Sequence, residues 1–568
     1  LAVPASLHAS LMARLDRLGP AKEVAQIGAA IGREFSHALL AAVTHKAEAR
    51  LQSALDRLMA AGLLFRQGAP PHATYLFKHA LVRDAAYGTL LREPRRTLHA
   101  RIAETLENQF AEIAENQPEL LARHCTEAGL TEKAASLWGN AGERSLGRSA
   151  SFEAVSQLTR ALDQIATLPG TPALRKEQIK LQVALANALM HVKGYSAPES
   201  KAAIEQARLL IEQAEALGEV SEDPLFLFSV LYGFWVMNYV AGNAVSRDLA
   251  AHFLSLAEKQ EAIAPLLVGN RIMGHSLFYE GNFVQARMHY DRGIALYNPA
   301  EHRPLATRFS HDSGMAILSF RAWTLWALGY PNAALRDSSG ALKYARDANQ
   351  AASRMFALFH APTLQLLCGD YAAAVEGADE LSALAEEKSA SLWKVSAIVH
   401  HGCILAVAGR ASEAVETLAA GIAAARSTEQ RLFHPLYLSF LARAHADLGQ
   451  IEDAWRRVGE AVATIEATKE TWSEAEVHRV AGELALKSPG RNTAKAEAYF
   501  ERALAVARQQ QAKSWELRAA MSMARLWRDQ GKWDEARDLL APVYGWFTEG
   551  FDTLDLKEAK ALLEQLAI

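Results

Sequence analysis

The chain has 568 residues, half of them apolar, and three cysteines that lie far apart, at Cys125, Cys368 and Cys403. This length exceeds one hydrophobic core, the apolar content excludes a disordered chain, and the scarce cysteines exclude a disulfide framework. The net charge of −4 excludes a chain-wide attraction to nucleic acid or anionic lipid, although residues 1–105 carry 14 basic against 8 acidic side chains, a net of +6.

The first thirty residues carry charges throughout and lack the apolar segment of a signal peptide, and the chain begins at Leu1 instead of Met. Because the cysteine usage also fits a reducing compartment, we expect a cytoplasmic protein. The start of the chain is consistent with a fragment of a longer protein.

Residues 1–105 are predicted to form a small domain of short helices followed by a β-hairpin. Helices are indicated at residues 3–19, 20–32, 36–43 and 47–62. After Gly62, two short apolar runs, 63–67 and 74–79, are divided by a Gly-Ala-Pro-Pro connection, which is typical of a hairpin. Short helices and then a hairpin are the plan of a winged-helix domain.

The stretch from Leu225 to Ser246 has 22 residues without a charge, which is long enough to span a bilayer. It contains Ser229, Asn238 and Asn243, and it lies between helical hairpins of the type found in soluble proteins. A helix that is apolar all round also occurs inside large proteins, so we interpret the stretch as a buried repeat helix and expect no membrane contact.

From residue 106 to the end, the chain is predicted to be an array of helical hairpins with a period of about 40 residues. Glycine ends a helix in a left-handed conformation without steric penalty, and an alanine five residues later lets two antiparallel helices approach closely. The turn glycines are Gly281, Gly329, Gly369, Gly409, Gly449, Gly490 and Gly531. The alanines are Ala286, Ala334, Ala374, Ala414, Ala454 and Ala536, with Ala496 displaced by a longer turn.

Aromatic residues recur at the start of the first helix of a pair. Trp393, Phe433 and Trp515 each lie sixteen residues before a turn glycine, and Trp472 has the same place in the longer repeat. We expect these rings to pack one hairpin on the next, since aromatics bury the most area per residue. A cofactor-binding stripe is the alternative.

The repeats resemble the tetratricopeptide family. Besides the turn glycine and the alanine, some repeats have an aromatic at +2 (Phe283, Tyr371, Trp533) and a small residue at +12 (Gly293, Ala341, Gly421, Ala461). Pro331, Ala411 and Ile451 depart from the +2 pattern, and the period exceeds the family's 34 residues. The resemblance implies an all-α superhelical solenoid whose helices are longer by about one turn.

A second resemblance covers nearly the whole chain. Residues 3–35, 61–91 and 98–107 resemble the segment after the ATPase module in bacterial signal-transduction ATPases with numerous domains, in particular those with an N-terminal class III adenylate/guanylate cyclase domain. It implies that the winged helix couples to an upstream ATPase module in cis, and that the repeats sense a protein or a small-molecule effector. ATP would bind that upstream module, so we expect no cofactor in these residues.

No catalytic motif is readable, and we expect no enzyme activity from these residues. The only Gly-Lys step, Gly531-Lys532, lies in a repeat turn and not in a phosphate loop. His400, His401 and Cys403 invite a metal interpretation, but adjacent helical histidines point apart and a second ligand pair is lacking. We interpret them as structural or surface residues.

Candidate binding positions follow from the tetratricopeptide resemblance, in which residues ten and six before the turn glycine line the concave face. They include Arg271, His275, Trp323, Arg443 and Arg525. A groove with arginine and tryptophan suits an acidic or aromatic ligand, although helix packing is the preferred interpretation of Trp323.

Two further surfaces concern the N-terminal domain. His79 and Arg83, at i and i+4, are candidates for contact with the ATPase module, and a solvated face is the alternative. Arg92, Arg95, Arg96 and Arg101 would suit DNA phosphates, which leaves a transcriptional activator as the alternative function and a free-standing adaptor as a third. Since the basic footprint is modest, nucleic-acid binding is not the expected function.

Overall fold

The computed structural model describes residues 5–219, 223–348, 350–427 and 429–567, with side chains from residue 11 on. The chain divides into two compact units, Leu1–Arg144 with Ser156–Leu174, and Ser145–Val155 with Arg175–Ile568. Each unit is described by itself below.

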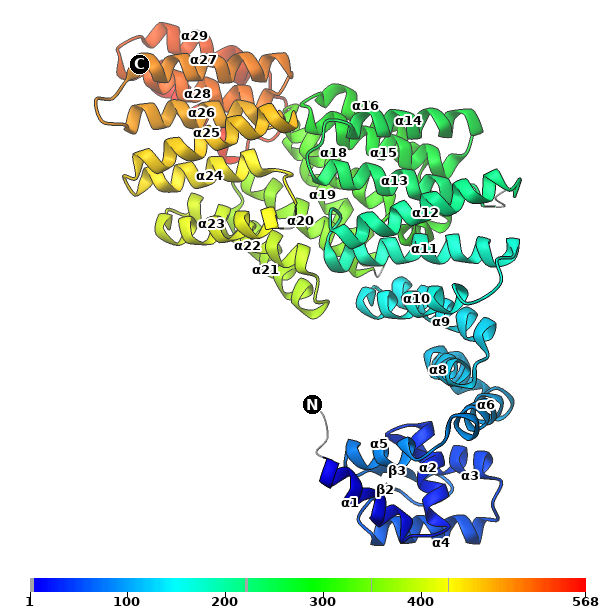
Figure 1. The fold of residues 1–568 in the computed structure, drawn as a ribbon. Helices are drawn as coiled ribbons and strands as arrows, with labels where there is room; N and C mark the ends of the chain where they lie inside the picture. The colour runs from blue at the N-terminus through cyan, green and yellow to red at the C-terminus, as the bar shows by residue number, and fades with distance from the viewer. Residues whose placement is uncertain (1–4, 220–222, 349, 428, 568) are drawn as a thin grey trace. The chain divides into compact units, whose positions relative to one another are not determined.

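The first unit begins with four helices and a small antiparallel sheet (Figure 1). The helices are α1 (Ala5–Asp16), α2 (Ala21–Ile31), α3 (His37–Thr44) and α4 (Glu48–Ala60). The strands are β1 (Glu34–Ser36), β2 (Leu64–Gln67) and β3 (Thr74–Phe77), in the order β1-β3-β2. Tyr75 and Phe77 on β3 and Leu55 and Leu58 on α4 are fully buried and form its core.

The predicted hairpin is therefore present as β2 and β3, and β1 is an additional strand that was not predicted. Phe35 in β1 pairs with Tyr75, and its ring fills the space beside Gly28, where an added Cβ would lie 2.7 Å from the ring. A strand of three residues between two helices is too short for an alternating pattern to show.

The rest of the first unit is helical: α5 (Ala80–Gly88), α6 (Arg92–Gln109), α7 (Ala111–Asn116), α8 (Pro118–Ala128), α9 (Thr131–Gly147) and α10 (Ser151–Ile165). The predicted domain boundary after residue 105 falls within α6, and the domain assignment stays a prediction. Gly129 ends α8 with a φ of 72°, and Ala134, five residues later, is fully buried.

The second unit is a continuous array of helices, and the turn glycines and alanines have the predicted roles in it. It opens with α11 (Pro172–Lys193), α12 (Pro198–Ala216), α13 (Leu225–Val240) and α14 (Ser246–Gln260). The paired helices are α15 (Ile263–Tyr279) and α16 (Phe283–Leu296), α18 (Ser313–Ala327) and α19 (Pro331–Asp347), α20 (Ala351–Cys368) and α21 (Tyr371–Glu387), α22 (Ser391–Val407) and α23 (Ala411–Ser427), α24 (His434–Asp447) and α25 (Ile451–Thr468), α26 (Glu474–Lys487) and α27 (Thr493–Gln509), and α28 (Lys513–Asp529) and α29 (Trp533–Gly545). The array also has α17 (Pro299–His302), the 3-10 helix η1 (Arg303–Thr307) and the terminal α30 (Leu554–Leu566).

All seven turn glycines have positive φ, from 72° to 91°, and the alanines that follow them are fully buried. The repeated aromatics Trp393, Phe433, Trp472 and Trp515 are buried in the array, in line with the packing interpretation. The protein is all-α apart from its small sheet, and its main part is a tetratricopeptide-like solenoid of helical hairpins.

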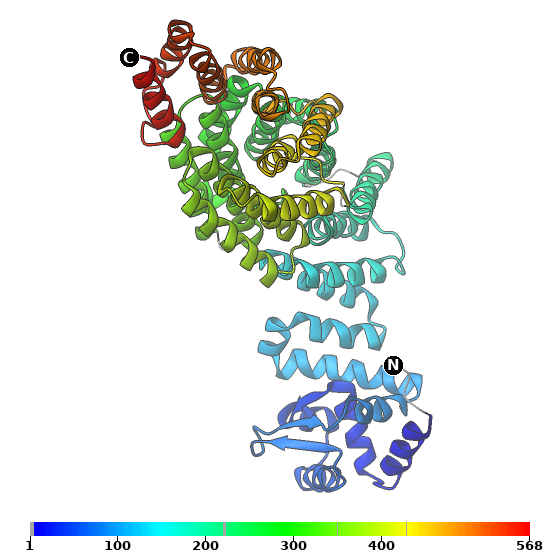
Figure 2. The same cartoon turned by 90° about the vertical axis from the view of Figure 1, so that its left-hand side faces the viewer.

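Successive turns of this solenoid contact one another. The amide of Arg431 donates to the carbonyl oxygen of Val240 at 3.1 Å, and the amide of Thr471 donates to that of Tyr279 at 3.0 Å. Arg518 on α28 donates to the carbonyl oxygen of Leu367 at 2.8 Å. Figure 2 shows the orange and red C-terminal helices beside the green helices that they contact. The C-terminal hairpins therefore close over the inner face of the earlier ones.

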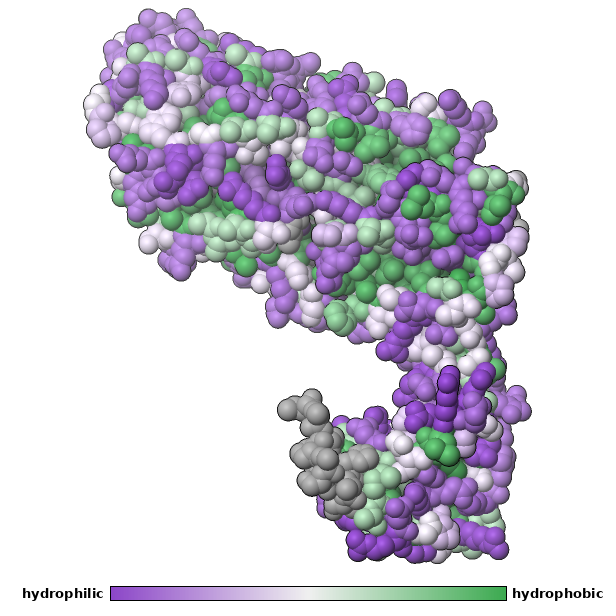
Figure 3. Space-filling model, in the orientation of Figure 1, coloured by the Kyte–Doolittle hydropathy of each residue, from purple (hydrophilic) through white to green (hydrophobic). Residues whose placement is uncertain are grey.

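The uncharged stretch that begins at Leu225 forms α13, a helix of 16 residues, followed by a turn in which Gly242 has a φ of 70°. Phe228, Tyr232, Trp235 and other residues around its circumference are buried among neighbouring helices, as the buried-helix interpretation predicts. Within the described residues, none of the helices has the length and apolarity that crossing a bilayer would require. Apolar patches are visible among the polar surface over α11 to α14 (Figure 3).

Candidate functional site

The predicted concave-face residues do not line an open groove. Arg271, His275 and Trp323 are only 1%, 4% and 1% exposed. The Trp323 ring stacks on Trp472, with centroids 5.3 Å apart, and its indole N–H donates to the carbonyl oxygen of His360 at 2.9 Å. Because the next superhelical turn covers these positions, Trp323 is a core residue, in line with the packing alternative.

Arg443 and Arg525 lie elsewhere in the array. Arg443 is exposed on α24, and Arg525 on α28 pairs with Glu558 at the surface, with 2.7 Å between nitrogen and oxygen. Of the five predicted binding residues, the structure brings only Arg271 and His275 together at one cavity.

His79 and Arg83 both reach solvent, but they do not share a helix face as the sequence analysis assumed. His79 has extended backbone angles, φ −137° and ψ 142°, and precedes the first residue of α5. Arg83 pairs with the adjacent Asp84. The β3 strand ends just before His79, so the helical register starts too late to include it.

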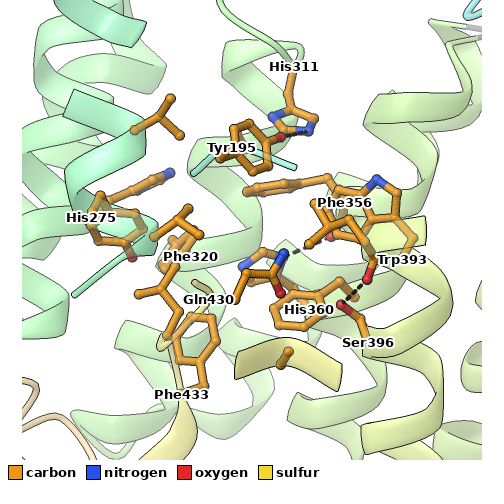
Figure 4. A pocket seen from close by; sticks show the side chains of 18 of the residues that line it. Tyr195, His275, His311, Phe320, Phe356, His360, Trp393, Ser396, Gln430 and Phe433 are labelled. Atoms are coloured by element: carbon orange, nitrogen blue, oxygen red, sulfur yellow. Dashed lines mark hydrogen bonds between the residues drawn. The ribbon is translucent and has the colours of Figure 1, made fainter. Parts of the chain in front are cut away.

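A cavity of about 110 Å³ lies inside the array, lined by the inner faces of α13, α15, α18, α20, α22 and α24 (Figure 4). Since one water molecule needs roughly 10–15 Å³ on this measure, the space suits a ligand of several non-hydrogen atoms. Its half-exposed lining residues, including Leu392, Val395, Ser396, Gln430 and Leu432, mark the side that reaches solvent.

Flat rings form much of the cavity wall. The rings of Trp235 and Tyr239 on α13 are stacked, with centroids 4.8 Å apart and an angle of 17°. The His275 ring stacks on Phe320 at 3.9 Å. Phe356, His360 and Trp393 point into the same space from α20 and α22 (Figure 4). The surface offered to a ligand is therefore mainly apolar and planar.

Arg271 is the only formally charged side chain in the lining that the structure describes. Its Nη1 donates to the carbonyl oxygen of His311 and to Ser313 Oγ, its Nη2 donates to the carbonyl oxygen of Phe309, and its guanidinium lies 5.0 Å from the ring centre of Tyr232. Its Nε has no hydrogen-bond partner, and within the described residues no carboxylate forms an ion pair with it. The positive charge therefore has neutral partners only.

The histidines of the cavity are held in the neutral form. Burial lowers the pKa of His360 to about 3 and that of His434 to about 4, and burial together with Arg271 depresses the pKa of His275 and His311. The Nδ1 of His360 lies 2.8 Å from the carbonyl oxygen of Phe356 and must donate to it. The Nε2 of this neutral ring is then an acceptor.

Five buried polar atoms in the lining have no hydrogen-bond partner: Arg271 Nε, Tyr239 Oη, His360 Nε2, Trp393 Nε1 and His434 Nε2. A buried polar group without a partner costs roughly 1–3 kcal/mol. All five belong to side chains that line the cavity, and the atoms themselves are buried.

The His400 and His401 pair does not form a metal site. His400 Nε2 lies 3.3 Å from Thr363 Oγ1, whereas His401 turns toward Asp379 on α21. Burial raises the pKa of the Cys403 thiol well above its usual value. In the described part of the chain, no group of three or more histidine, cysteine or acidic side chains could hold a metal ion.

A second hollow of about 360 Å³ lies between α16, α28 and α29 and has a more basic lining, including Arg287, Arg508 and Lys513. Two of these cations already pair with Glu516, Arg508 at 2.9 Å and Lys513 at 2.7 Å. Because these cations already have a carboxylate partner, an added anion would stabilise this hollow less than it would stabilise the Arg271 cavity.

Several cavity residues escaped the sequence analysis, which used positions ten and six before the turn glycine. Phe320 and His360 both lie nine residues before it and face the cavity. Packing was the preferred interpretation of Trp393, with a cofactor-binding stripe as the alternative, and the structure places it in the cavity lining with an unpartnered indole nitrogen. A histidine or aromatic recurring at the ninth position was the available signal.

No family model matches the chain. It is 26% identical over 518 residues to an uncharacterized protein of Rhizobium meliloti (strain 1021), an alignment that covers 91% of this chain and 50% of that protein. The chain thus spans about half the length of the curated relative it matches.

Among solved structures, the chain is similar to a Rap protein complexed with competence and sporulation factor, with 13% identity and a TM-score of 0.49 over 67% of this chain and 99% of that one. It is also similar to a signal-transduction ATPase with numerous domains and a tetratricopeptide-repeat sensor from Pyrococcus horikoshii, with 10% identity and a TM-score of 0.30 over 96% of this chain and 65% of that one. Both scores are below 0.5, and neither structure fixes a ligand or partner for this chain.

Proposed function

We propose that this chain is the sensor region of a larger bacterial signalling ATPase, and that its helical array binds a small effector in the Arg271 cavity. The observation that carries the proposal is the cavity itself, where aromatic side chains surround a buried cation that has neutral partners only. The closed inner face favours a small effector over an extended peptide, which would need the superhelical turns to separate.

We propose that the effect of ligand binding is transmitted to an ATPase module in cis by the N-terminal helices and sheet. We assign these elements as a winged helix that contacts this module. This assignment, and the link to an adenylate/guanylate cyclase domain, rests on the sequence resemblance. An effector biases such an output only by binding two arrangements of the protein unequally. Since the cavity is lined by six helices from consecutive hairpins, a ligand there would favour one curvature of the array.

The test uses the full-length product of the reading frame that encodes this chain. ATP turnover is measured with and without a small-molecule fraction from the source cells. Ser396→Trp, at the solvent side of the cavity, should abolish the response, because the indole fills the space. Ser391→Trp, on the exposed first residue of the same helix α22, is the matched control and should keep it.

A response that survives Ser396→Trp would show that the effector binds elsewhere. A reading frame without a nucleotide-binding module would refute the ATPase assignment and favour the free-standing adaptor.

DNA contact by residues 1–105 is the second candidate, favoured by the net charge of +6. Of the four candidate arginines, Arg92, Arg95, Arg96 and Arg101, the structure uses two internally. Arg96 donates to the carbonyl oxygen of Ala128 at 2.8 Å, and Arg95 donates to that of Leu90 at 3.0 Å and stacks on the ring of Tyr87. We therefore expect no salt-dependent retention of the chain on duplex DNA, and retention at low ionic strength would revive the transcriptional activator.

A further inference from the structure

We propose that the effector of the Arg271 cavity is a small aromatic carboxylate, with its acid group on Arg271 and its ring between the aromatic walls. This inference rests on the proposed function and adds the chemical class of the ligand. It combines three independent features of the cavity: an unpaired charge, planar walls and a defined set of free donors and acceptors.

The first feature is the charge of Arg271. A buried cation is expensive unless an anion or a full set of acceptors compensates it, and removal from water costs several kilocalories per mole. Here three acceptors and one ring surround the guanidinium, its Nε–H is free, and the described lining contains no acidic side chain. The same charge repels a cationic ligand, so the missing partner is an anion.

The second feature is the shape and polarity of the walls. The Trp235–Tyr239 and His275–Phe320 stacks present flat apolar surfaces, and Phe356 and Trp393 face them from the other side of the cavity (Figure 4). A ring enclosed by aromatic side chains gains from offset or edge-to-face contacts. A saccharide would place many hydroxyl groups against these rings, with few partners for them.

The third feature is the pattern of free polar atoms. The Trp393 indole N–H and the Arg271 Nε–H are unpartnered donors on lining side chains, and His360 Nε2 is an unpartnered acceptor. All three atoms are buried, so a ligand that pairs with them requires a small shift of the lining side chains. An aromatic acid with a ring hydroxyl or ring N–H supplies both the acceptor oxygens and the donor. The volume of about 110 Å³ favours a single ring over a nucleotide.

The side chains near the solvent side of the cavity also favour an anionic ligand. Arg426 and Arg431 lie close enough to His434 for their charges to lower its pKa, and Arg431 is exposed. Arg426 has a partner in Glu460, with 3.3 Å between nitrogen and oxygen, whereas Arg431 forms no ion pair with the residues that the structure describes. An exposed arginine near the entrance attracts anions from solution.

Three probes of similar size separate the charge from the ring: 4-hydroxyphenylacetate, tyramine and 4-hydroxyphenethyl alcohol. They are titrated into the purified 568-residue chain by calorimetry, with thermal shift as a second readout. We expect the acid to bind at least about tenfold more tightly than the amine or the alcohol, because a hydrogen bond to a charged group is worth roughly 1.5–3 kcal/mol.

Arg271→Met should remove the preference for the acid, and Arg443→Met, which changes an exposed arginine of a later repeat, should leave it intact. Arg271 also holds the carbonyl oxygens of Phe309 and His311, so its variant can lose stability. Trp393→Phe provides a second test, since it keeps an aromatic ring and removes the N–H donor together with part of the indole. We expect it to weaken binding of the acid several-fold.

Tyramine binding as tightly as the acid, or acid binding to Arg271→Met as tightly as to the native chain, would overturn the inference. If none of the probes binds while the ATP-turnover response remains sensitive to Ser396→Trp, the aromatic-acid assignment fails and the proposed function stands. If the response is also insensitive to Ser396→Trp, both fail.

Discussion

Glu470 offers a quantitative test of how the superhelical turns close on one another. Its carboxyl is fully buried in the turn between α25 and α26, where it accepts hydrogen bonds from the amide of Phe433 at 3.0 Å and from the indole N–H of Trp472 at 2.9 Å. The next residue, Thr471, donates its amide to Tyr279 of the earlier superhelical turn. Glu470→Gln keeps a carbonyl acceptor for both donors and removes the titration.

Burial raises the pKa of Glu470 from 4.5 to about 8, although the neighbouring N–H groups favour the ionised form. Between these two values the unfolded chain has lost the proton and the folded chain still holds it, so the free energy of unfolding falls as the pH rises. At about 1.4 kcal/mol per pH unit, the native chain should lose roughly 4 kcal/mol relative to Glu470→Gln between pH 5 and pH 9.

The assay is urea denaturation followed by tryptophan fluorescence at a series of pH values, together with hydrogen exchange at the amides of Phe433 and Trp472. The difference between the native chain and Glu470→Gln removes the contribution of the buried histidines, which titrate in both proteins. Glu466→Gln, an exposed position on the same helix, is the control. A difference that stays constant from pH 5 to pH 9 would refute the reasoning, since it would show that Glu470 is ionised in the folded chain throughout.

Two further predictions concern the array. Gly369→Ala and Gly531→Ala both place an alanine at a left-handed position, φ 83° and 81°, which costs about 1–2 kcal/mol. Only at Gly369 would the new Cβ meet another superhelical turn, 2.3 Å from Leu554 Cβ, so Gly369→Ala should lose roughly 1–3 kcal/mol more in urea denaturation. Equal losses would argue against that contact. Trp323→Ala should destabilise the chain by about 3–5 kcal/mol, and Arg443→Ala by less than about 0.5 kcal/mol, in the same assay. If Trp323→Ala leaves the free energy of unfolding unchanged, Trp323 is not a core residue and becomes a candidate binding position again.

Local features were readable from the sequence because their causes lie within one hairpin. A glycine at a corner and an alanine five residues later meet within about 40 residues of chain, and the structure has both in their predicted places at Gly281 and Ala286. The uncharged stretch in α13 was correctly assigned to the protein interior. Its polar residues, and the flanking helical hairpins of the type found in soluble proteins, are both visible in the sequence. The short strand β1 and the late start of α5 after His79 were missed, because three residues or one terminal position leave no periodic signal.

The candidate site depended on tertiary structure. Arg271 and His275 could be nominated from repeat positions, but their burial, and the exclusion of Arg443 and Arg525 from the same site, follow from closure of the superhelix. That closure brings Val240 beside Arg431 and Tyr279 beside Thr471, residues about 190 positions apart. Each hairpin adds a small rotation to the next, and the sequence of one repeat does not reveal the sum. The sequence by itself therefore determined the hairpins and their small-residue contacts, whereas the summed curvature decided that an expected open groove is a largely buried cavity with one side toward solvent.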